Sequence, residues 1–146
     1  IASAEAFAIH RNQLAARRDG YDPYVATRLD GGSTILAADY IAMHRERDAT
    51  YTAVQAVTRP FDALLLPTSP CVPPKIAPLD TTDALMKASA RVLRNTALSN
   101  YLDRPTITIP CHRAGEAPVG LSLMGSRHHD RRLLAIAAGV ERIVRA

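Results

Sequence analysis

The chain has 146 residues, about the size of one ordinary domain, and we expect a single domain over residues 1–146. Its 47% hydrophobic and 22% charged residues are typical of a soluble globular protein, and no apolar run approaches the roughly 20 residues that a membrane span requires. The net charge of +4 comes from basic residues scattered among acidic ones, without interleaved aromatic side chains, which disfavours a nucleic-acid-binding surface.

Targeting, cysteine and metal signals are weak. The first eighteen residues mix charges and lack a continuous apolar core, so no signal peptide is recognisable and a cytoplasmic location is expected. Cys71 and Cys111 are too few and too far apart for a disulfide framework or a structural zinc site. The adjacent His128 and His129 are a poor ligand pair, because neighbouring histidines rarely bind one ion together. We therefore expect no metal and no cofactor.

The first part of the chain predicts helices separated by turn formers. Residues 1–18 are rich in alanine and contain neither proline nor glycine, which favours a helix. A second, short helix is expected over residues 25–29, after Pro23. Residues 35–58 also lack proline and glycine and carry an imperfect apolar stripe, so they should form the longest helix.

The turn Gly31-Gly32-Ser33 needs separate treatment, because a glycine-flanked serine can be a nucleophile. No complete G-x-S-x-G motif follows it, so the elbow of an α/β-hydrolase is unsupported. The simpler interpretation is a turn in which Ser33 or Thr34 caps the helix that follows, with the hydroxyl accepting from early backbone N–H groups.

The segment Phe61–Leu66 is a nearly continuous apolar run, which predicts a strand buried on both faces. The proline-rich segment Pro67–Pro74 cannot donate enough backbone hydrogen bonds to remain in a central sheet, so it should be a rigid, extended loop. In an open α/β sheet, ligands bind beyond the carboxyl ends of strands.

The remaining elements complete an α/β pattern. A helix over residues 83–98 should start near Thr81 and place Val92 and Leu93 inward. Two short strands follow, Thr106–Ile109 and Val119–Met124, joined by a hairpin loop. In the second strand, Leu121 and Leu123 should share one face, and Gly120, Ser122 and Met124 the other. A clean apolar stripe then predicts a helix over Leu133–Val144, packed on a sheet of about three strands.

Several blocks of the sequence resemble the amidase signature family in order and spacing. One block is similar to the C-terminal signature of that family: Thr96, Asn100, Pro105, Pro110, Pro118–Leu121 and Gly125. A second, Phe61–Pro70, is similar to the strand of the family that leads into a Pro-Thr-x-Pro turn. Weaker matches are Gly31, Ala38–Tyr40, Arg47, Asp130 and Leu133–Leu134. Together the blocks cover most of the chain from about Tyr24 onward.

The resemblance implies a large mixed β-sheet covered by helices on both faces, of which these strands form part. It also implies amide hydrolysis through a serine nucleophile, a second serine on a cis peptide and a lysine. Those motifs, which lie in a Gly/Ser-rich segment nearer the N-terminus, do not occur in this sequence. We therefore expect the C-terminal portion of a larger amidase, without catalytic residues of its own and partnered by the N-terminal remainder.

The resemblance further implies that part of this chain forms the wall of a pocket for a small amide substrate. The residues concerned are Pro67, Thr68, Ser69, Pro70 and Asn100. An amidotransferase-like subunit that releases ammonia from glutamine fits the same blocks, and a non-catalytic interaction module fits the absence of a complete catalytic constellation. A chain cut from a larger sheet should expose an apolar face or an unpaired strand edge, so we expect self-association or a homodimer.

Overall fold

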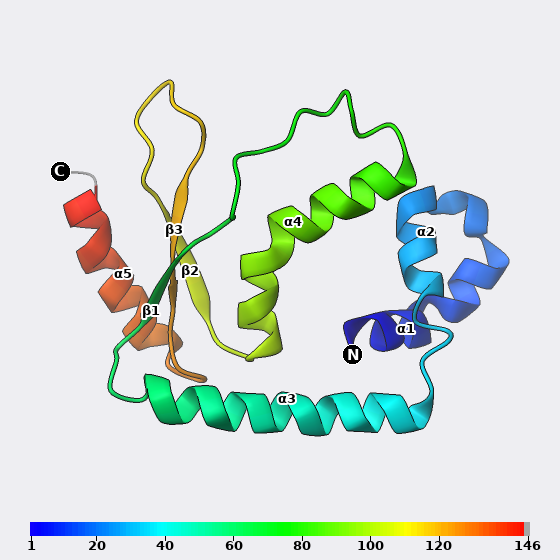
Figure 1. Cartoon of the computed structure of the whole chain (residues 1–146), viewed down its shortest axis with the longest axis horizontal. Coiled ribbons are helices and arrows are strands. Elements are labelled where there is room, and N and C mark those ends of the chain that lie inside the picture. Colours follow the sequence, from blue (N-terminus) through cyan, green and yellow to red (C-terminus); the bar gives the residue numbers. More distant parts are fainter. Residues whose placement is uncertain (145–146) are drawn as a thin grey trace. The chain divides into compact units, whose positions relative to one another are not determined.

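The computed structural model describes residues 1–144 and contains, in that range, five α-helices, one short 3₁₀ helix and one three-stranded sheet (Figure 1). The chain divides into two compact units, Ile1–Thr50 and Tyr51 onward, with the boundary inside the longest helix. The predicted α/β class with three strands is confirmed. The prediction of a single domain over residues 1–146 stays a prediction.

The first unit consists of helix α1 (Ala2–Ala16), the 3₁₀ helix η1 (Arg18–Gly20), helix α2 (Pro23–Asp30) and the beginning of α3 (Ala37–Thr58). All three predicted helices are therefore confirmed, and α3 is the longest of the described helices. The Asp22 side chain caps α2 by accepting from the N–H groups of Tyr24 and Val25. The core of this unit joins α1 to α2 through the buried residues Leu14, Ala26 and Leu29.

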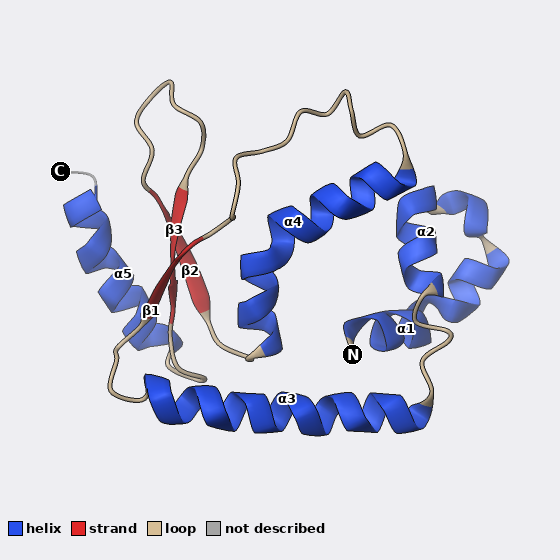
Figure 2. Ribbon diagram, in the orientation of Figure 1, coloured by secondary structure: helices blue, strands red, loops and turns tan. Residues whose placement is uncertain are grey.

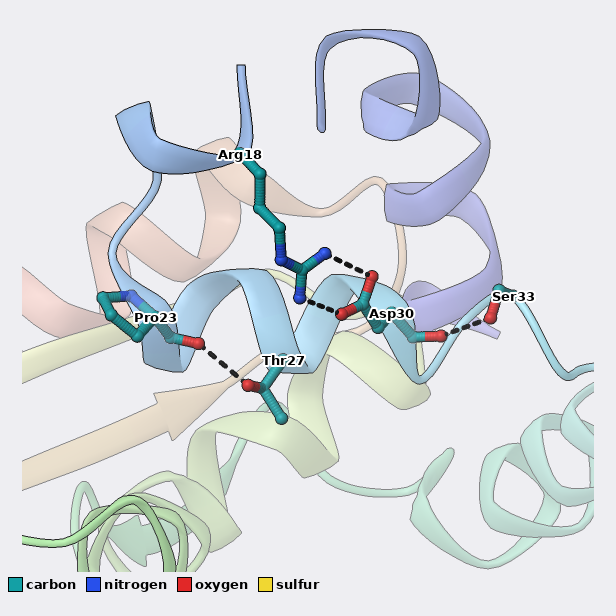
Figure 3. Close-up of polar contacts among 5 residues, drawn as sticks. All are labelled: Arg18, Pro23, Thr27, Asp30 and Ser33. Carbon is teal, nitrogen blue, oxygen red and sulfur yellow. Dashed lines mark hydrogen bonds and ion pairs between the residues drawn. The ribbon is translucent and has the colours of Figure 1, made fainter. Parts of the chain in front are cut away.

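The turn after α2 forms as expected, but the prediction that Ser33 or Thr34 caps the following helix is wrong. The Ser33 hydroxyl donates backward to the Asp30 carbonyl at 2.7 Å (Figure 3), and the Thr34 hydroxyl donates to the Gly31 carbonyl. Both hydroxyls therefore satisfy carbonyls at the end of α2, where four backbone acceptors lack helical partners. A Cβ on Gly32 would lie 2.0 Å from the Ser3 carbonyl oxygen, so the close approach to α1 requires glycine.

An ion pair closes the same turn region. Arg18 donates through two nitrogens to the two carboxylate oxygens of Asp30, at 3.3 and 2.5 Å (Figure 3). The hydrogen bond from Arg18 is the main cause that lowers the pKa of Asp30 below its usual value. The same bond raises the pKa of Arg18, so the pair is fully charged at neutral pH.

The second unit contains β1 (Leu64–Pro67), α4 (Thr82–Tyr101), β2 (Thr106–Pro110), β3 (Gly120–Met124) and α5 (Asp130–Val144). The strands form one sheet in the order β1-β3-β2, and both pairings are antiparallel. This confirms that the three predicted strands share a sheet and that the last two form a hairpin. Figure 2 distinguishes these strands from the helices and loops by colour. The Thr81 hydroxyl caps α4 by accepting from the Ala84 N–H.

Helix α5 packs on one face of the sheet, as predicted. Its Leu133 and Ala137 form a buried cluster with Ile109 of β2 and Leu123 of β3. The register places Ser122 and Thr108 opposite each other on the other face, and Leu121 and Leu123 on the face that α5 covers. The predicted division of β3 into two faces is therefore confirmed.

Two burial predictions are wrong. The apolar run that ends in β1 is not buried on both faces, because Phe61 is 62% exposed and Leu65 is 63% exposed. The reason is strand order: β1 lies at an edge of the sheet, and the central strand is β3, whose Ser122, Leu123 and Met124 are buried. On α4, Leu93 was expected to face inward but is 46% exposed.

Candidate functional site

A hollow of about 580 Å³ opens at the end of the sheet where β1 and β2 finish and β3 begins. The proline-rich loop at residues 68–74 forms one wall, and the hairpin loop with Pro118 and Val119 forms another. Val92 of α4 also lines it. The hollow therefore lies at the carboxyl end of β1, where the sequence predicted a ligand position.

Three hydroxyl groups form a cluster on the sheet face opposite α5, which we call the hydroxyl cluster: Thr68, Thr108 and Ser122. The Thr68 hydroxyl lies 2.7 Å from that of Ser122 and donates to that of Thr108 at 3.1 Å. Thr108 and Ser122 are 3.1 Å apart. Thr68 and Thr108 line the hollow, whereas Ser122 lies beneath them and is 2% exposed.

Gly120 permits this cluster to form. A Cβ at that position would lie 2.6 Å from the Thr108 methyl carbon and 2.7 Å from the Thr68 hydroxyl oxygen. Both distances are shorter than real side chains tolerate, so any other residue would push the threonines apart. The Gly120 carbonyl also accepts from the Thr68 N–H at 2.9 Å, which extends the pairing of β1 with β3 by one step.

Two hydrogen bonds join helix α4 to the first residues of the proline-rich loop. The Asn95 side-chain amide donates to the Pro67 carbonyl at 2.7 Å, and the Ser69 hydroxyl donates to the Val92 carbonyl at 3.3 Å. Prolines lack a backbone donor, so such side-chain contacts have to hold the loop in place. The loop is thereby anchored beside the hydroxyl cluster.

The hairpin loop is held by contacts around Val119. The Cys111 N–H donates to the Val119 carbonyl at 3.0 Å, and the Val119 N–H donates to Nδ1 of His112 at 3.3 Å. His112 is exposed, as predicted, and its side chain contributes to the lining of the hollow. At the tip of the loop, the Glu116 carboxylate accepts from the Arg113 N–H at 2.9 Å.

The residues predicted to form a substrate-pocket wall fall in different places. Thr68, Ser69 and Pro70 line the hollow, whereas Pro67 belongs to β1 and offers its carbonyl to Asn95. Asn100 lines a second hollow, described below. Their part in binding a substrate stays a prediction.

The sequence reasoning missed other residues of the hollow, chiefly Thr108, Gly120, Val92 and Val119. A signal for Thr108 was present, because strict alternation in Thr106–Pro110 places both threonines on the face opposite Ile107 and Ile109.

The second hollow, of about 380 Å³, is lined by polar side chains near the start of β2 and of α5. The Arg127 guanidinium pairs with the Asp103 carboxylate at 2.5 Å and lies 4.5 Å from the centre of the Tyr51 ring. Arg104 is 7% exposed and donates to the side-chain oxygens of Gln55 and Thr58, both at 2.7 Å. These contacts join α3 to the segment before β2, so the arginines have a structural use.

The hydroxyl groups of the first hollow are arranged for binding. The hydrogen bonds of the hydroxyl cluster join hydroxyl to hydroxyl, and the Ser69 hydroxyl donates to a backbone carbonyl and lies 4.0 Å from the Cys71 sulfur. None of these contacts involves a His, Asp, Glu or Lys side chain as a general base, which activation of a serine requires. Lys87 pairs with the Asp83 carboxylate at 2.7 Å on the exposed surface of α4.

Two other kinds of site are absent from residues 1–144. No group of three or more His, Cys, Asp or Glu side chains there could hold a metal ion. In the same range, every helix is too short or too polar to cross a membrane.

Comparison with known proteins gives a consistent picture. A family model described as Amidase matches residues 3–134. The 2-amino-5-chloromuconic acid deaminase of Comamonas testosteroni is 28% identical over 145 residues, which cover 99% of this chain and 31% of that protein. A glutamyl-tRNA(Gln) amidotransferase subunit of Sulfurisphaera tokodaii is 31% identical over 133 residues, covering 88% of this chain and 28% of that protein.

A solved structure agrees with the sequence relatives. A protein described as an amidase superposes with a TM-score of 0.78 and 26% identity, covering 96% of this chain and 33% of that one. The chain thus spans about a third of the length of the proteins that it matches.

Proposed function

The chain belongs to the amidase family, and from this premise we propose that it is the C-terminal portion of a larger enzyme that hydrolyses carboxamide C–N bonds. The observation that carries the proposal is the hollow at the end of the sheet, where the Thr68–Pro70 turn contributes Thr68 to the hydroxyl cluster. The chain matches only about a third of the length of each relative, which supports the proposal that it is a portion of a larger enzyme.

In the proposed reaction, a serine of the N-terminal remainder attacks the amide carbonyl and expels the amine, and water then releases the acid from the acyl-enzyme. The attacking hydroxyl requires a base and an oxyanion stabiliser close to it. The hydroxyls of the hollow bond to one another and to a carbonyl, so we assign them to binding. This chain supplies sheet core and part of the pocket wall.

The surface of the second unit supports a partner on the sheet. Strands β1 and β2 are both edges of the three-stranded sheet, and the apolar residues Leu65 of β1 and Phe61, which precedes the strand, are exposed. Unpaired edges and apolar surface are typical of interfaces. We propose that the partner is the N-terminal remainder. The alternative is a homodimer of this chain, which sedimentation would detect.

A second candidate is a subunit that releases ammonia from glutamine for another enzyme. The observation in its favour is the 31% identity to a glutamyl-tRNA(Gln) amidotransferase subunit. The two candidates share the acyl-enzyme chemistry and differ in the substrate and in where the ammonia goes.

The proposal is tested by comparing the 146-residue chain with a longer protein that carries the upstream sequence. Both are incubated with a fluorophosphonate serine probe and with simple amides. We expect labelling and turnover only from the longer protein. Labelling of the short chain that disappears on Ser33→Ala, Ser69→Ala or Ser122→Ala would contradict the assignment of catalysis to the remainder. A start codon directly before Ile1, with no upstream reading frame, would favour the interaction module.

A further inference from the structure

The wall of the first hollow is mostly apolar. Of the described residues that line it, none is Asp, Glu, Lys or Arg, and Nδ1 of its histidine, His112, accepts from the Val119 N–H. Five are prolines and three are valines, and Val72 and Val119 are 54% and 47% exposed. A group that enters from solvent therefore exchanges water for apolar surface along most of this wall. Such a surface stabilises an apolar group by removing its area from water and offers a charged group no carboxylate, ammonium or guanidinium partner.

The floor of the hollow has a different character, because Thr68 and Thr108 of the hydroxyl cluster form it. Three hydroxyls have three hydrogens, and the three contacts between them can use all of these hydrogens in a closed ring. The direction from Thr68 to Thr108 agrees with such a ring. What then faces the hollow from Thr68 and Thr108 is lone pairs, which accept hydrogen bonds. The N–H groups of a carboxamide are suitable donors.

We propose that this hollow selects a neutral carboxamide with an apolar substituent, and that it disfavours glutamine. The amide group lies toward Thr68 and Thr108, and the substituent lies along Val72, Val92 and Val119. The volume of about 580 Å³ is within the usual range for small-molecule sites. This inference rests on the proposed function. Of the two candidates there, it favours the amidase over the subunit that releases ammonia from glutamine.

Glutamine is the informative competitor because it has the same amide. It adds an α-ammonium and an α-carboxylate, and the described wall offers the ammonium no Asp or Glu and the carboxylate no Lys or Arg. Desolvating a charge without a partner is costly, whereas an alkyl chain at the same place gains from burial. Pentanamide is glutamine with the carboxylate replaced by methyl and the ammonium by hydrogen, so this pair isolates the effect of the two charges.

The test uses the full-length protein that contains this chain and measures kcat/KM for pentanamide and for L-glutamine. We expect pentanamide to be preferred by about 100-fold or more, as for substrates that differ by unpartnered polar groups. A matched pair of variants locates the effect. Val119→Arg, at an exposed position of the wall, should reduce the preference by at least about tenfold. Ile143→Arg, which is exposed on α5 and outside the hollow, should leave it unchanged.

The outcomes separate this inference from the proposed function. Hydrolysis with equal or greater kcat/KM for glutamine overturns the inference and leaves amide hydrolysis intact. A preference that Val119→Arg and Ile143→Arg change equally also overturns it, because the hollow is then not its source. No hydrolysis of any amide by the full-length protein overturns the proposed function, and this inference with it.

Discussion

The Thr68 hydroxyl lies 2.7 Å from the Ser122 hydroxyl, across the boundary between β1 and β3. Ser122 is 2% exposed, so its polar group depends on the two threonines for hydrogen bonds. A buried hydroxyl inside a three-stranded sheet is tolerated only when it is paired. The hydroxyl cluster thus links the stability of the sheet to the floor of the hollow.

Replacement of Ser122 by alanine should destabilise the protein. The change removes two hydrogen-bonded contacts from a buried position, for which we expect the free energy of unfolding to fall by about 1–2 kcal/mol. Urea denaturation measures this. Ser3→Ala, on the exposed surface of α1, is the control and should have almost no effect. Equal losses for the two variants would show that the cluster does not stabilise the sheet.

Two glycine-to-alanine changes should have opposite signs. Gly120→Ala places a Cβ 2.6 Å from the Thr108 methyl carbon, so we expect a loss of about 1–3 kcal/mol from overpacking. Gly139→Ala, inside α5, has open space around the added carbon and should stabilise by up to about 1 kcal/mol through helix propensity. Thermal unfolding of both variants distinguishes the two effects, and a neutral Gly120→Ala would contradict the close packing of the threonines.

Neighbouring leucines of α5 provide a test of the core. Leu133 is 4% exposed and contacts the cluster with Ile109 and Leu123, whereas Leu134 is 58% exposed. Leu133→Ala should therefore cost about 2–5 kcal/mol, because it leaves a cavity. Leu134→Ala should cost much less. If both variants unfolded at the same denaturant concentration, the assignment of the buried face of α5 would be wrong.

Local signals in the sequence were sufficient to predict every helix and strand of the second unit. Short apolar runs between turn formers predicted β2 and β3, and the period of the apolar residues predicted α5. What these signals could not supply is strand order. The run at Phe61–Leu66 is the most apolar of the three and was expected to be buried on both faces, yet it contributes an edge strand. Strand order follows from tertiary pairing, which composition does not encode.

The candidate site was predictable only in part, for a similar reason. The proline-rich loop is recognisable from the sequence, because consecutive prolines cannot continue a central strand. The meeting of Thr68 with Thr108 and Ser122 depends on register between strands up to 54 residues apart. For Ser33 the sequence predicted the wrong helix. Its hydroxyl donates to the Asp30 carbonyl at the end of the preceding helix and does not cap the helix that follows.

The final prediction concerns the pH response of the pair between Arg18 and Asp30. The pKa of Asp30 is lowered chiefly by the hydrogen bond from Arg18, so the charged carboxylate is favoured in the folded state. The stability that this pair contributes is therefore present above the unfolded-state pKa of Asp30, about 4, and is lost as pH falls through the lower folded-state value. Both side chains are partly exposed, 57% for Arg18 and 43% for Asp30, so the contribution should be small and should weaken with salt.

NMR titration of the Asp30 carboxyl carbon measures this directly. We expect a pKa below that of an ordinary aspartate, and an upward shift in the Arg18→Gln variant, which removes the donor. Arg11→Gln is a matched control, because Arg11 is an exposed arginine of α1 that keeps the net charge change the same. An equal shift in the two variants would mean that overall charge, and not the hydrogen bond from Arg18, sets the pKa of Asp30. The geometry of the pair predicts that the pKa of Asp30 shifts upward in Arg18→Gln and not in Arg11→Gln. In the unchanged protein, high salt should make the lowering of this pKa smaller.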